Sequence, residues 1–304
     1  MNDGKMRAGF VAIIGAPNAG KSTLMNQLVG QKIAIVSPKV QTTRVNMRGI
    51  VTRENTQFIF IDTPGIYRPG SRLLDRSMVQ AAHQARDDAD ATVLMVDAFK
   101  GFNEPVMDII EILQSKKPKN LSLVFNKVDK MPKEKLLPLM VKAQEMDLFD
   151  NVFAISATKG KGVEDILKAI EPSMPESPYL YSEDDVTDMP MRLLAAEITR
   201  ERAFMMLNQE LPYGLAVETV SYETEADGKL VIHQNILIER EAHKPIIVGK
   251  GGAMIKRIGE QARRNLQEML QKKHLNLFLK VKVKANWSES STFMQEIGLE
   301  PSKD

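Results

Sequence analysis

The chain has 304 residues, no cysteine, and 41 Lys and Arg against 39 Asp and Glu, a formal net charge of +2. This length favours two domains, and the lack of cysteine excludes disulfides, a thiol nucleophile and a cysteine-based metal site. The first residues lack the apolar core of a signal peptide, and no apolar run approaches the ~20 residues that span a bilayer. The composition therefore predicts a cytoplasmic protein without a transmembrane segment.

A glycine-rich loop follows the first apolar run, residues 10–14. Residues 15–22 read Gly-Ala-Pro-Asn-Ala-Gly-Lys-Ser, which fits G-x-x-x-x-G-K-[ST], and a helical run begins at Ser22. This order predicts a phosphate-binding loop, because the glycines let backbone N–H groups turn toward one anion and the helix N-terminus adds its dipole. Lys21 would reach the β- and γ-phosphates, and the Ser22 hydroxyl would bind Mg²⁺. An ordinary glycine-rich turn is the alternative that this motif leaves open. The predicted nucleotide-binding residues of this loop are Gly15, Ala16, Pro17, Asn18, Ala19, Gly20, Lys21, Ser22 and Thr23.

An aspartate follows the next apolar run, residues 59–61, and begins the segment Asp62-Thr63-Pro64-Gly65. At the carboxyl end of a parallel strand, Asp62 lies at the mouth of a nucleotide cleft and can hold Mg²⁺. The Gly65 N–H would sense the γ-phosphate. A plain Asp-Thr-Pro-Gly turn is the alternative. Residues 45–53 and 57–62 are expected to form the one antiparallel strand pair of the sheet.

A guanine-recognition pattern follows the run 121–125, where Asn126-Lys127-Val128-Asp129 fits N-K-x-D. The two Asp129 carboxylate oxygens would accept from guanine N1–H and the 2-amino group. Adenine has no such donor pair, so a carboxylate left without a partner would reject ATP. Asn126 would brace the loop and reach the base, and the Lys127 stem would pack over its face.

A fourth apolar run, residues 152–155, ends in Ser156-Ala157. A backbone N–H from this loop, that of Ala157, would donate to guanine O6. The pair Ser156-Ala157 indicates a guanine-binding loop only because it follows the fourth predicted strand.

The ordered motifs resemble the translation-factor-like branch of the Ras-type GTPases over residues 7–172. The resemblance implies that Gln41-Thr42-Thr43-Arg44 is switch I, whose threonine coordinates Mg²⁺ only when the γ-phosphate is present. Thr43 is the favoured ligand and Thr42 the second choice. The alternative is a polar surface loop.

Ile66 stands where Ras-like enzymes carry a glutamine that orients the attacking water. Isoleucine cannot hydrogen-bond water, so catalytic help must come from elsewhere. In several relatives a phosphate-loop asparagine helps to hold K⁺, and Asn18 matches that position; a loop-stabilising amide is the equal alternative. The catalytic residues implied are Lys21, Thr43, Gly65 and Asn18, with direct in-line attack of water on the γ-phosphate.

A change of composition separates the two halves of the chain. Residues 171–190 contain four prolines and six acids but no Lys or Arg. This favours an extended, solvated linker over residues 173–190, between a GTPase domain at 1–172 and a second domain at 191–304. A functional acidic segment is the alternative.

The second half predicts a helix at 191–208, strands at 215–222, 230–238 and 275–283, and a G-x-x-G loop that opens an amphipathic helix. This is the order of a prokaryotic-type KH domain, in which about four single-stranded nucleotides lie across the loop. Residues 239–285 carry twelve Lys and Arg against four acids, a difference of +8, which favours nucleic acid over a plain solvated basic face. The predicted RNA contacts are Gly249, Lys250, Gly251, Gly252, Lys256 and Arg257.

An α/β P-loop GTPase with a doubly wound, mostly parallel sheet, followed by an α+β KH domain, closely resembles the Era family of bacterial ribosome-assembly GTPases over nearly the whole chain. Residues 41–44, 210–213 and 255–259 also look like segments of that family. The resemblance implies GTP or GDP, Mg²⁺ and K⁺ as cofactors. It implies the 30S subunit and a single-stranded region near the 3′ end of 16S rRNA as partners, with a role in small-subunit maturation. It also implies peripheral contact with the cytoplasmic face of the inner membrane.

Two other functions are possible for a phosphate-binding loop joined to an RNA-binding domain. A P-loop ATPase or kinase acting on RNA or a metabolite is disfavoured by the N-K-x-D pattern at 126–129. A non-hydrolysing RNA module with a vestigial nucleotide fold is disfavoured by the intact Lys21, Ser22 and Asp62.

Overall fold

The computed structural model of the protein describes residues 5–37, 39, 44, 47–63, 72–116, 118–207 and 211–302, apart from the side chains of residues 212 and 213. The chain forms two compact units, Met1–Asp188 with Gly298–Asp304, and Met189–Ile297. The strands of the first unit are β1 (Arg7–Gly15), β2 (Met47–Arg53), β3 (Thr56–Asp62), β4 (Ala91–Asp97), β5 (Leu121–Asn126) and β6 (Asn151–Ala154). Its helices are α1 (Lys21–Val29), α2 (Leu73–Asp87), α3 (Glu104–Lys116), α4 (Lys133–Glu145) and α5 (Val163–Ile170).

The sheet of the first unit has the order β2-β3-β1-β4-β5-β6 within the described residues. Every neighbouring pair is parallel except β2 with β3, so the predicted antiparallel pair is confirmed. The strand β4, between β1 and β5, was not predicted. The central strands are continuous apolar runs because helices cover both faces of a parallel sheet.

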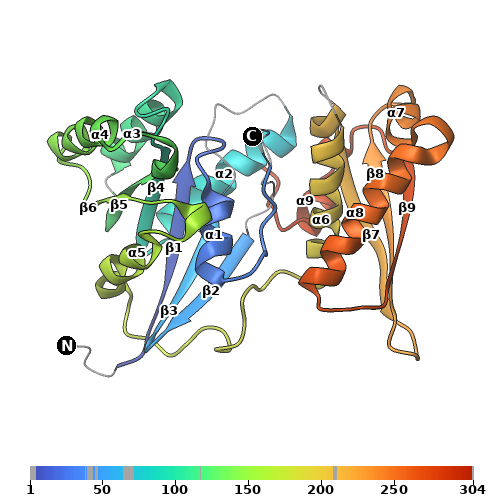
Figure 1. Ribbon diagram of the computed structural model, residues 1–304, viewed down its shortest axis with the longest axis horizontal. Coiled ribbons are helices and arrows are strands. Elements are labelled where there is room, and N and C mark those ends of the chain that lie inside the picture. The colour runs from blue at the N-terminus through green and yellow to red at the C-terminus, as the bar shows by residue number, and fades with distance from the viewer. Residues whose placement is uncertain are drawn as a thin grey trace. The chain divides into compact units, whose positions relative to one another are not determined.

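The helices of the first unit form two layers around the sheet (Figure 1). Residues of α2, α3 and α4 share one apolar core with Ile14, Leu94 and Leu123 of the sheet. On the opposite face, α1 and α5 contact each other. Because β1, β3, β4 and β5 are parallel, their carboxyl ends meet at one edge, where the polar residues that follow them collect.

The segment 173–188 was expected to be a solvated linker; it is largely exposed, but it belongs to the first unit and is held along it. The buried Gln57 side chain accepts a hydrogen bond from the Tyr181 N–H at 3.0 Å and donates to the Tyr181 carbonyl at 3.0 Å. Asp188 pairs with Arg48 of β2 at 2.7 Å. The prolines and acids indicated an extended polar segment, but composition could not show that polar groups of the first unit hold it in place.

The second unit contains α6 (Met191–Met206), β7 (Leu215–Thr224), β8 (Leu230–Ile238), α7 (Lys244–Val248), α8 (Ala253–Met269), β9 (Leu275–Val283) and α9 (Ser291–Glu296). Its sheet has the order β7-β8-β9, with β7 antiparallel and β9 parallel to β8. The helices α6 and α8 lie on one face of this sheet (Figure 1), and Ala196, Ile236 and Ile258 join them in a common core. The predicted order of elements is confirmed.

The end of the chain belongs to the first unit, although the second domain was predicted to run to residue 304. The Ser302 N–H donates to the Ser77 hydroxyl of α2 at 3.0 Å, and Leu299 is buried. A short tail without a periodic apolar pattern gives no sequence signal for the surface that it covers.

Candidate functional site

The phosphate loop joins β1 to α1 at the carboxyl edge of the first sheet. Gly20 caps α1 with φ 104°, and a Cβ at this position would overlap the Asn126 side-chain amide. The Lys21 ammonium lies inside the loop, where it donates to Gly15 O at 3.0 Å and Ala16 O at 3.4 Å. The backbone here follows a tight path around a buried cation, which suits the loop to an anion.

A carboxylate and a hydroxyl meet beside this loop. The Ser22 hydroxyl donates to Asp62 Oδ2 at 2.6 Å, and the Asp62 side chain is buried. Burial lowers the pKa of Lys21, and the Asp62 carboxylate partly offsets that effect. A phosphate would add negative charge beside this ammonium and favour its charged form.

The same two side chains fit Mg²⁺, which prefers oxygen ligands and is held by one or two carboxylates together with substrate phosphates. Larger groups of three or more His, Cys, Asp or Glu that could hold a metal are absent from the part of the chain that the structure describes. Ser22 and Asp62 are therefore the described residues that suit the ion predicted for this site.

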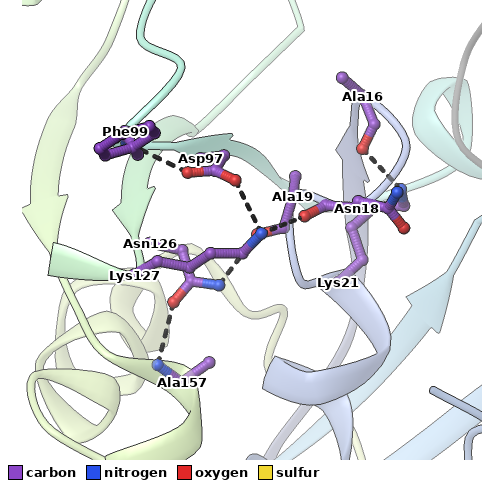
Figure 2. A network of polar contacts seen from close by, with 9 residues as sticks. All are labelled: Ala16, Asn18, Ala19, Lys21, Asp97, Phe99, Asn126, Lys127 and Ala157. Carbon is purple, nitrogen blue, oxygen red and sulfur yellow. Dashed lines mark hydrogen bonds and ion pairs between the residues drawn. The ribbon is translucent and has the colours of Figure 1, made fainter. Parts of the chain in front are cut away.

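An amide clamp joins the phosphate loop to two other strand ends (Figure 2). Asn126 Nδ2 donates to Ala19 O at 2.9 Å, and Asn126 Oδ1 accepts from the Ala157 N–H at 3.0 Å. Asn126 thus braces the loop as predicted. The Ala157 N–H, predicted to donate to guanine O6, has Asn126 as its partner here, so the guanine contact stays a prediction.

Lys127 forms a second link, which the sequence did not reveal (Figure 2). Its ammonium donates to Asn18 O at 2.6 Å and pairs with Asp97 Oδ2 at 2.7 Å. Asp97 ends β4, the strand that was not predicted. An aspartate at the end of the apolar run 91–96 was the signal that could have identified it.

The predicted base-reading carboxylate, Asp129, lies in a short 3₁₀ turn after β5, and Lys127 enters that turn with φ 66°. A hydrogen bond from Ser156 is the main cause that lowers the pKa of Asp129, and Lys159, at 3.7 Å, adds to it. The carboxylate is therefore ionised and an acceptor at neutral pH. This is the state needed to accept the two guanine donors.

Several predicted residues lie outside the described residues: Thr42 and Thr43 of switch I, and Pro64, Gly65 and Ile66 after β3. Their neighbour Thr63 is buried, and its hydroxyl donates to Ile13 O at 2.9 Å. This bond fixes the end of β3 against β1, next to Asp62. The loop residues Pro17 and Thr23 are half-buried at the same edge.

The G-x-x-G loop lies between α7 and α8 in the second unit. Gly249, Gly251 and Gly252 have φ values of 73°, 59° and 78°. A Cβ at Gly251 or Gly252 would meet no atom within 4 Å, and Lys250, between Gly249 and Gly251, is exposed. The predicted residues therefore form an open turn at the start of α8 that a nucleic-acid backbone can approach.

A groove of about 360 Å³ lies between α8 and β9, and its lining starts at Ile255, three residues after this loop. From α8 it is lined by Lys256, Gly259, Glu260 and Arg263, and from β9 by Leu277, Phe278 and Leu279. Of the residues predicted to contact RNA, Lys256 lines this groove, whereas Arg257 is exposed outside its lining. The β9 side was not predicted, because pairing it with α8 depends on tertiary structure.

Comparison with known proteins gives the class. The family model described as "50S ribosome-binding GTPase" matches residues 10–127, and the family model described as "KH domain" matches residues 210–288. Fold, site and these matches define a P-loop GTPase joined to a KH domain. Across the described residues, no helix has both the length and the apolar content needed to cross a membrane.

Curated relatives and solved structures give the family. GTPase Era of Brucella suis biovar 1 (strain 1330) is 47% identical over 294 residues, covering 97% of this chain and 94% of the relative. GTPase Era of Caulobacter vibrioides (strain NA1000 / CB15N) is 44% identical over 309 residues, covering 97% of each. A crystal structure of Era with MgGDPNP and nucleotides 1506–1542 of 16S ribosomal RNA superposes with a TM-score of 0.91 and 39% identity, over 96% of this chain and 99% of that one. A crystal structure of a single-residue variant of Aquifex aeolicus Era, bound to GDP and AlF₄⁻, superposes with a TM-score of 0.91. It is 38% identical, over 96% of this chain and 99% of that one. The chain belongs to the Era family and is a GTPase, so the predicted enzyme class is confirmed.

Proposed function

We propose that this chain is a Mg²⁺-dependent GTP switch that binds single-stranded rRNA near the 3′ end of the small-subunit rRNA and acts in maturation of the 30S subunit. The observation that carries the nucleotide part is the clamp in which Asn126 links the phosphate loop to the Ala157 loop. That clamp fixes the base-reading loop and the phosphate-binding loop to one another. The distance between the proposed guanine and phosphate sites would thereby be set by the fold.

The chemistry proposed is in-line attack of water on the γ-phosphate, without a covalent intermediate. Lys21 and the backbone donors of the phosphate loop would hold the phosphates and stabilise the charge that develops. Asp129 would accept from guanine, and Asn126 would keep its loop in place. Thr43 would coordinate Mg²⁺ when the γ-phosphate is present, and the Gly65 N–H would sense the γ-phosphate.

Mg²⁺ and K⁺ are the proposed cations. When bound, Mg²⁺ neutralises charge on the β- and γ-phosphates, and Ser22, Asp62 and Thr43 are its proposed ligands. K⁺ at Asn18 would add positive charge where other GTPases use an arginine. In support, Asn18 has φ 64°, and its carbonyl is fixed by Lys127 at 2.6 Å, so the residue is held at the loop tip.

The proposed RNA site is the open loop 249–252 with the groove between α8 and β9. Its support is the +8 charge of residues 239–285, the open space around Gly251, and the apolar lining from Leu277 and Leu279. Phosphates would lie at the loop and bases in the groove. The Era structure at 39% identity was solved with a 16S rRNA segment, which supports the choice of RNA.

The function is tested by single-turnover hydrolysis of radiolabelled GTP, with and without a single-stranded RNA from the 3′ end of the small-subunit rRNA. We expect cleavage that excess GDP abolishes and excess ATP leaves unchanged. In-cell crosslinking followed by sequencing of the bound RNA tests the partner. Crosslinks spread over messenger RNA, with no enrichment at the small-subunit 3′ end, would contradict the ribosomal role.

Cytoplasmic location with peripheral contact at the inner membrane face is part of the proposal and rests on the family resemblance. Sedimentation with vesicles of anionic and of neutral lipid tests it. Pelleting with anionic vesicles at physiological salt is the expected result, and no pelleting with either would contradict it.

A further inference from the structure

The sheet face opposite α6 and α8 in the second unit is open along part of its length, although Leu237 of β8 and its partner Ala216 of β7 are buried there. Side chains alternate along a strand, and in β8 the residues facing α6 and α8 include the buried Leu230, Ile232, Gln234 and Ile236. Their neighbours point away. The outer sheet face is defined here by His233 and Asn235 of β8 and by Asn276, Phe278, Lys280 and Lys282 of β9.

Two rings stack on one another on this outer sheet face. His233 and Phe278 are direct cross-strand partners, and their rings stack at 4.7 Å with an interplanar angle of 14°. His233 is exposed, and Phe278 is 48% exposed. An exposed aromatic ring is a platform for a nucleobase, because every base has a π-face, and such stacking strengthens binding without selecting the sequence.

Two cations follow the rings along the same strand. Lys280 and Lys282 are exposed, and residues two apart on a strand are ~6.6 Å apart on one face. Neither lysine has an ion-pair partner within the described residues. The nearest acid by register, Glu218 of β7, is opposite Asn235 and accepts from its amide at 2.7 Å. The lysines are therefore free to contact phosphate.

The outer sheet face is continuous with the groove. β9 is the last strand of its sheet within the described residues, and its residues Leu277, Phe278 and Leu279 line the groove beside α8. Phe278 thus borders the groove and belongs to the outer sheet face. An RNA strand that leaves the groove across β9 would reach the two rings first and Lys280 next.

We infer that single-stranded RNA bound in the groove continues over the β9 edge, where one base stacks on the His233–Phe278 pair and phosphates contact Lys280 and Lys282. This inference rests on the proposed RNA binding and extends it to a longer site. An aromatic pair followed by cations in a line matches the alternation of base and phosphate in a nucleic acid. Apolar groups, which a protein partner would need, are few on this part of the face.

The test uses the full chain and three RNAs. One has four nucleotides, enough to fill a KH groove, and two have twelve nucleotides with the same four at the 5′ or the 3′ end. Only one of the longer RNAs can extend over β9. The variants are Lys280→Ala with Lys282→Ala, and His233→Ala; Lys133→Ala with Lys135→Ala, on α4, is the charge-matched control. Phe278 is left intact because it borders the groove.

We expect both outer-face variants to weaken one twelve-nucleotide RNA by about fivefold or more and to leave the four-nucleotide RNA unchanged. The double lysine variant should also reduce the slope of log affinity against log salt by about 1.4, since each phosphate contact contributes ~0.7. Unchanged affinity for both twelve-nucleotide RNAs would overturn the inference. An equal loss on the four-nucleotide RNA would overturn it too, because the residues would then act through the groove. If the unmodified chain binds none of the three RNAs, the proposed RNA binding itself fails.

Discussion

Two glycine loops in this chain are suited to phosphate, and they differ in what surrounds them. The loop at 15–22 is enclosed: Lys21 is buried, and a Cβ at Gly20 would overlap the Asn126 amide. The loop at 249–252 is open, with Lys250 exposed and no atom near a Cβ at Gly251. An enclosed, rigid loop suits one small ligand whose reacting atoms must be held in a fixed position. An open turn suits a polymer that passes across it.

Gly20→Ala should give the largest effect, because the new Cβ meets the Asn126 amide and the residue is held at φ 104°. GTP affinity should fall at least ~100-fold, about 2.8 kcal/mol. Gly30→Ala is the control, since Gly30 also has positive φ (80°) at the other end of α1 but has open space. Calorimetric titration of GTP should show near-normal binding for that control. Equal losses in the two variants would mean that backbone strain, and not enclosure, explains the effect.

Substitutions in the open loop should leave the fold of the second unit intact but should weaken RNA binding. Lys250→Asp with Gly251→Asp places two carboxylates where phosphate is expected, and repulsion should weaken RNA binding ~100-fold with a shallower salt dependence. GTP affinity and the circular dichroism spectrum should stay unchanged, because the loop is exposed and Gly251 has space. RNA binding as tight as in the unmodified chain would show that this G-x-x-G sequence is a plain helix-entry turn.

Asn126→Ala tests whether the enclosed loop depends on its clamp. It leaves Ala19 O and the Ala157 N–H without their partner, which should cost about 2 kcal/mol in unfolding free energy and ~10-fold in GTP affinity. Asn120→Ala is the matched control, since Asn120 precedes β5 and its amide donates to Asp90 O at 2.8 Å, away from the carboxyl edge. Urea unfolding should register both changes, and GTP titration only the first. A GTP loss in Asn120→Ala would remove the special role of the clamp.

The smallest effect is expected at the tip of the enclosed loop. If Asn18 helps to hold K⁺, basal GTP hydrolysis should be a few-fold faster in K⁺ than in Na⁺. Asn18→Ala should remove that difference and leave GDP affinity nearly unchanged. The measurement is a phosphate-release assay at equal ionic strength. Equal rates in the two salts for the unmodified chain would end the cation proposal.

Local sequence identified Lys21, Ser22, Asp62 and Asn126, which the structure brings together at the enclosed loop, because they stand in short motifs at strand ends. It also predicted the order of strands and helices in the second unit. It did not predict the pair of Lys127 with Asp97, since the two residues lie on different strands and meet only through the strand order. The course of 173–188 along the first unit and the end of the second unit at Ile297 were missed for a similar reason. Composition describes how polar a segment is, but not which surface it packs on.

The groove beside the open loop was only half predicted. The glycines and Lys256 were recognised from their spacing, whereas Leu277 and Leu279 follow from the packing of β9 against α8. On β9 these leucines alternate with Phe278 and Lys280, a pattern that predicts a strand but does not say which residues border a ligand.

The central claim is that the enclosed site reads guanine through Asp129, whose pKa is lowered chiefly by the hydrogen bond from Ser156. Asp129→Asn replaces one acceptor oxygen with an N–H donor, which suits xanthine with its 2-oxo group. The direct measurement is the affinity of both forms for GTP and for xanthosine triphosphate. We predict that the unmodified chain prefers GTP and that Asp129→Asn prefers xanthosine triphosphate. An Asp129→Asn protein that keeps its preference for GTP would contradict the account.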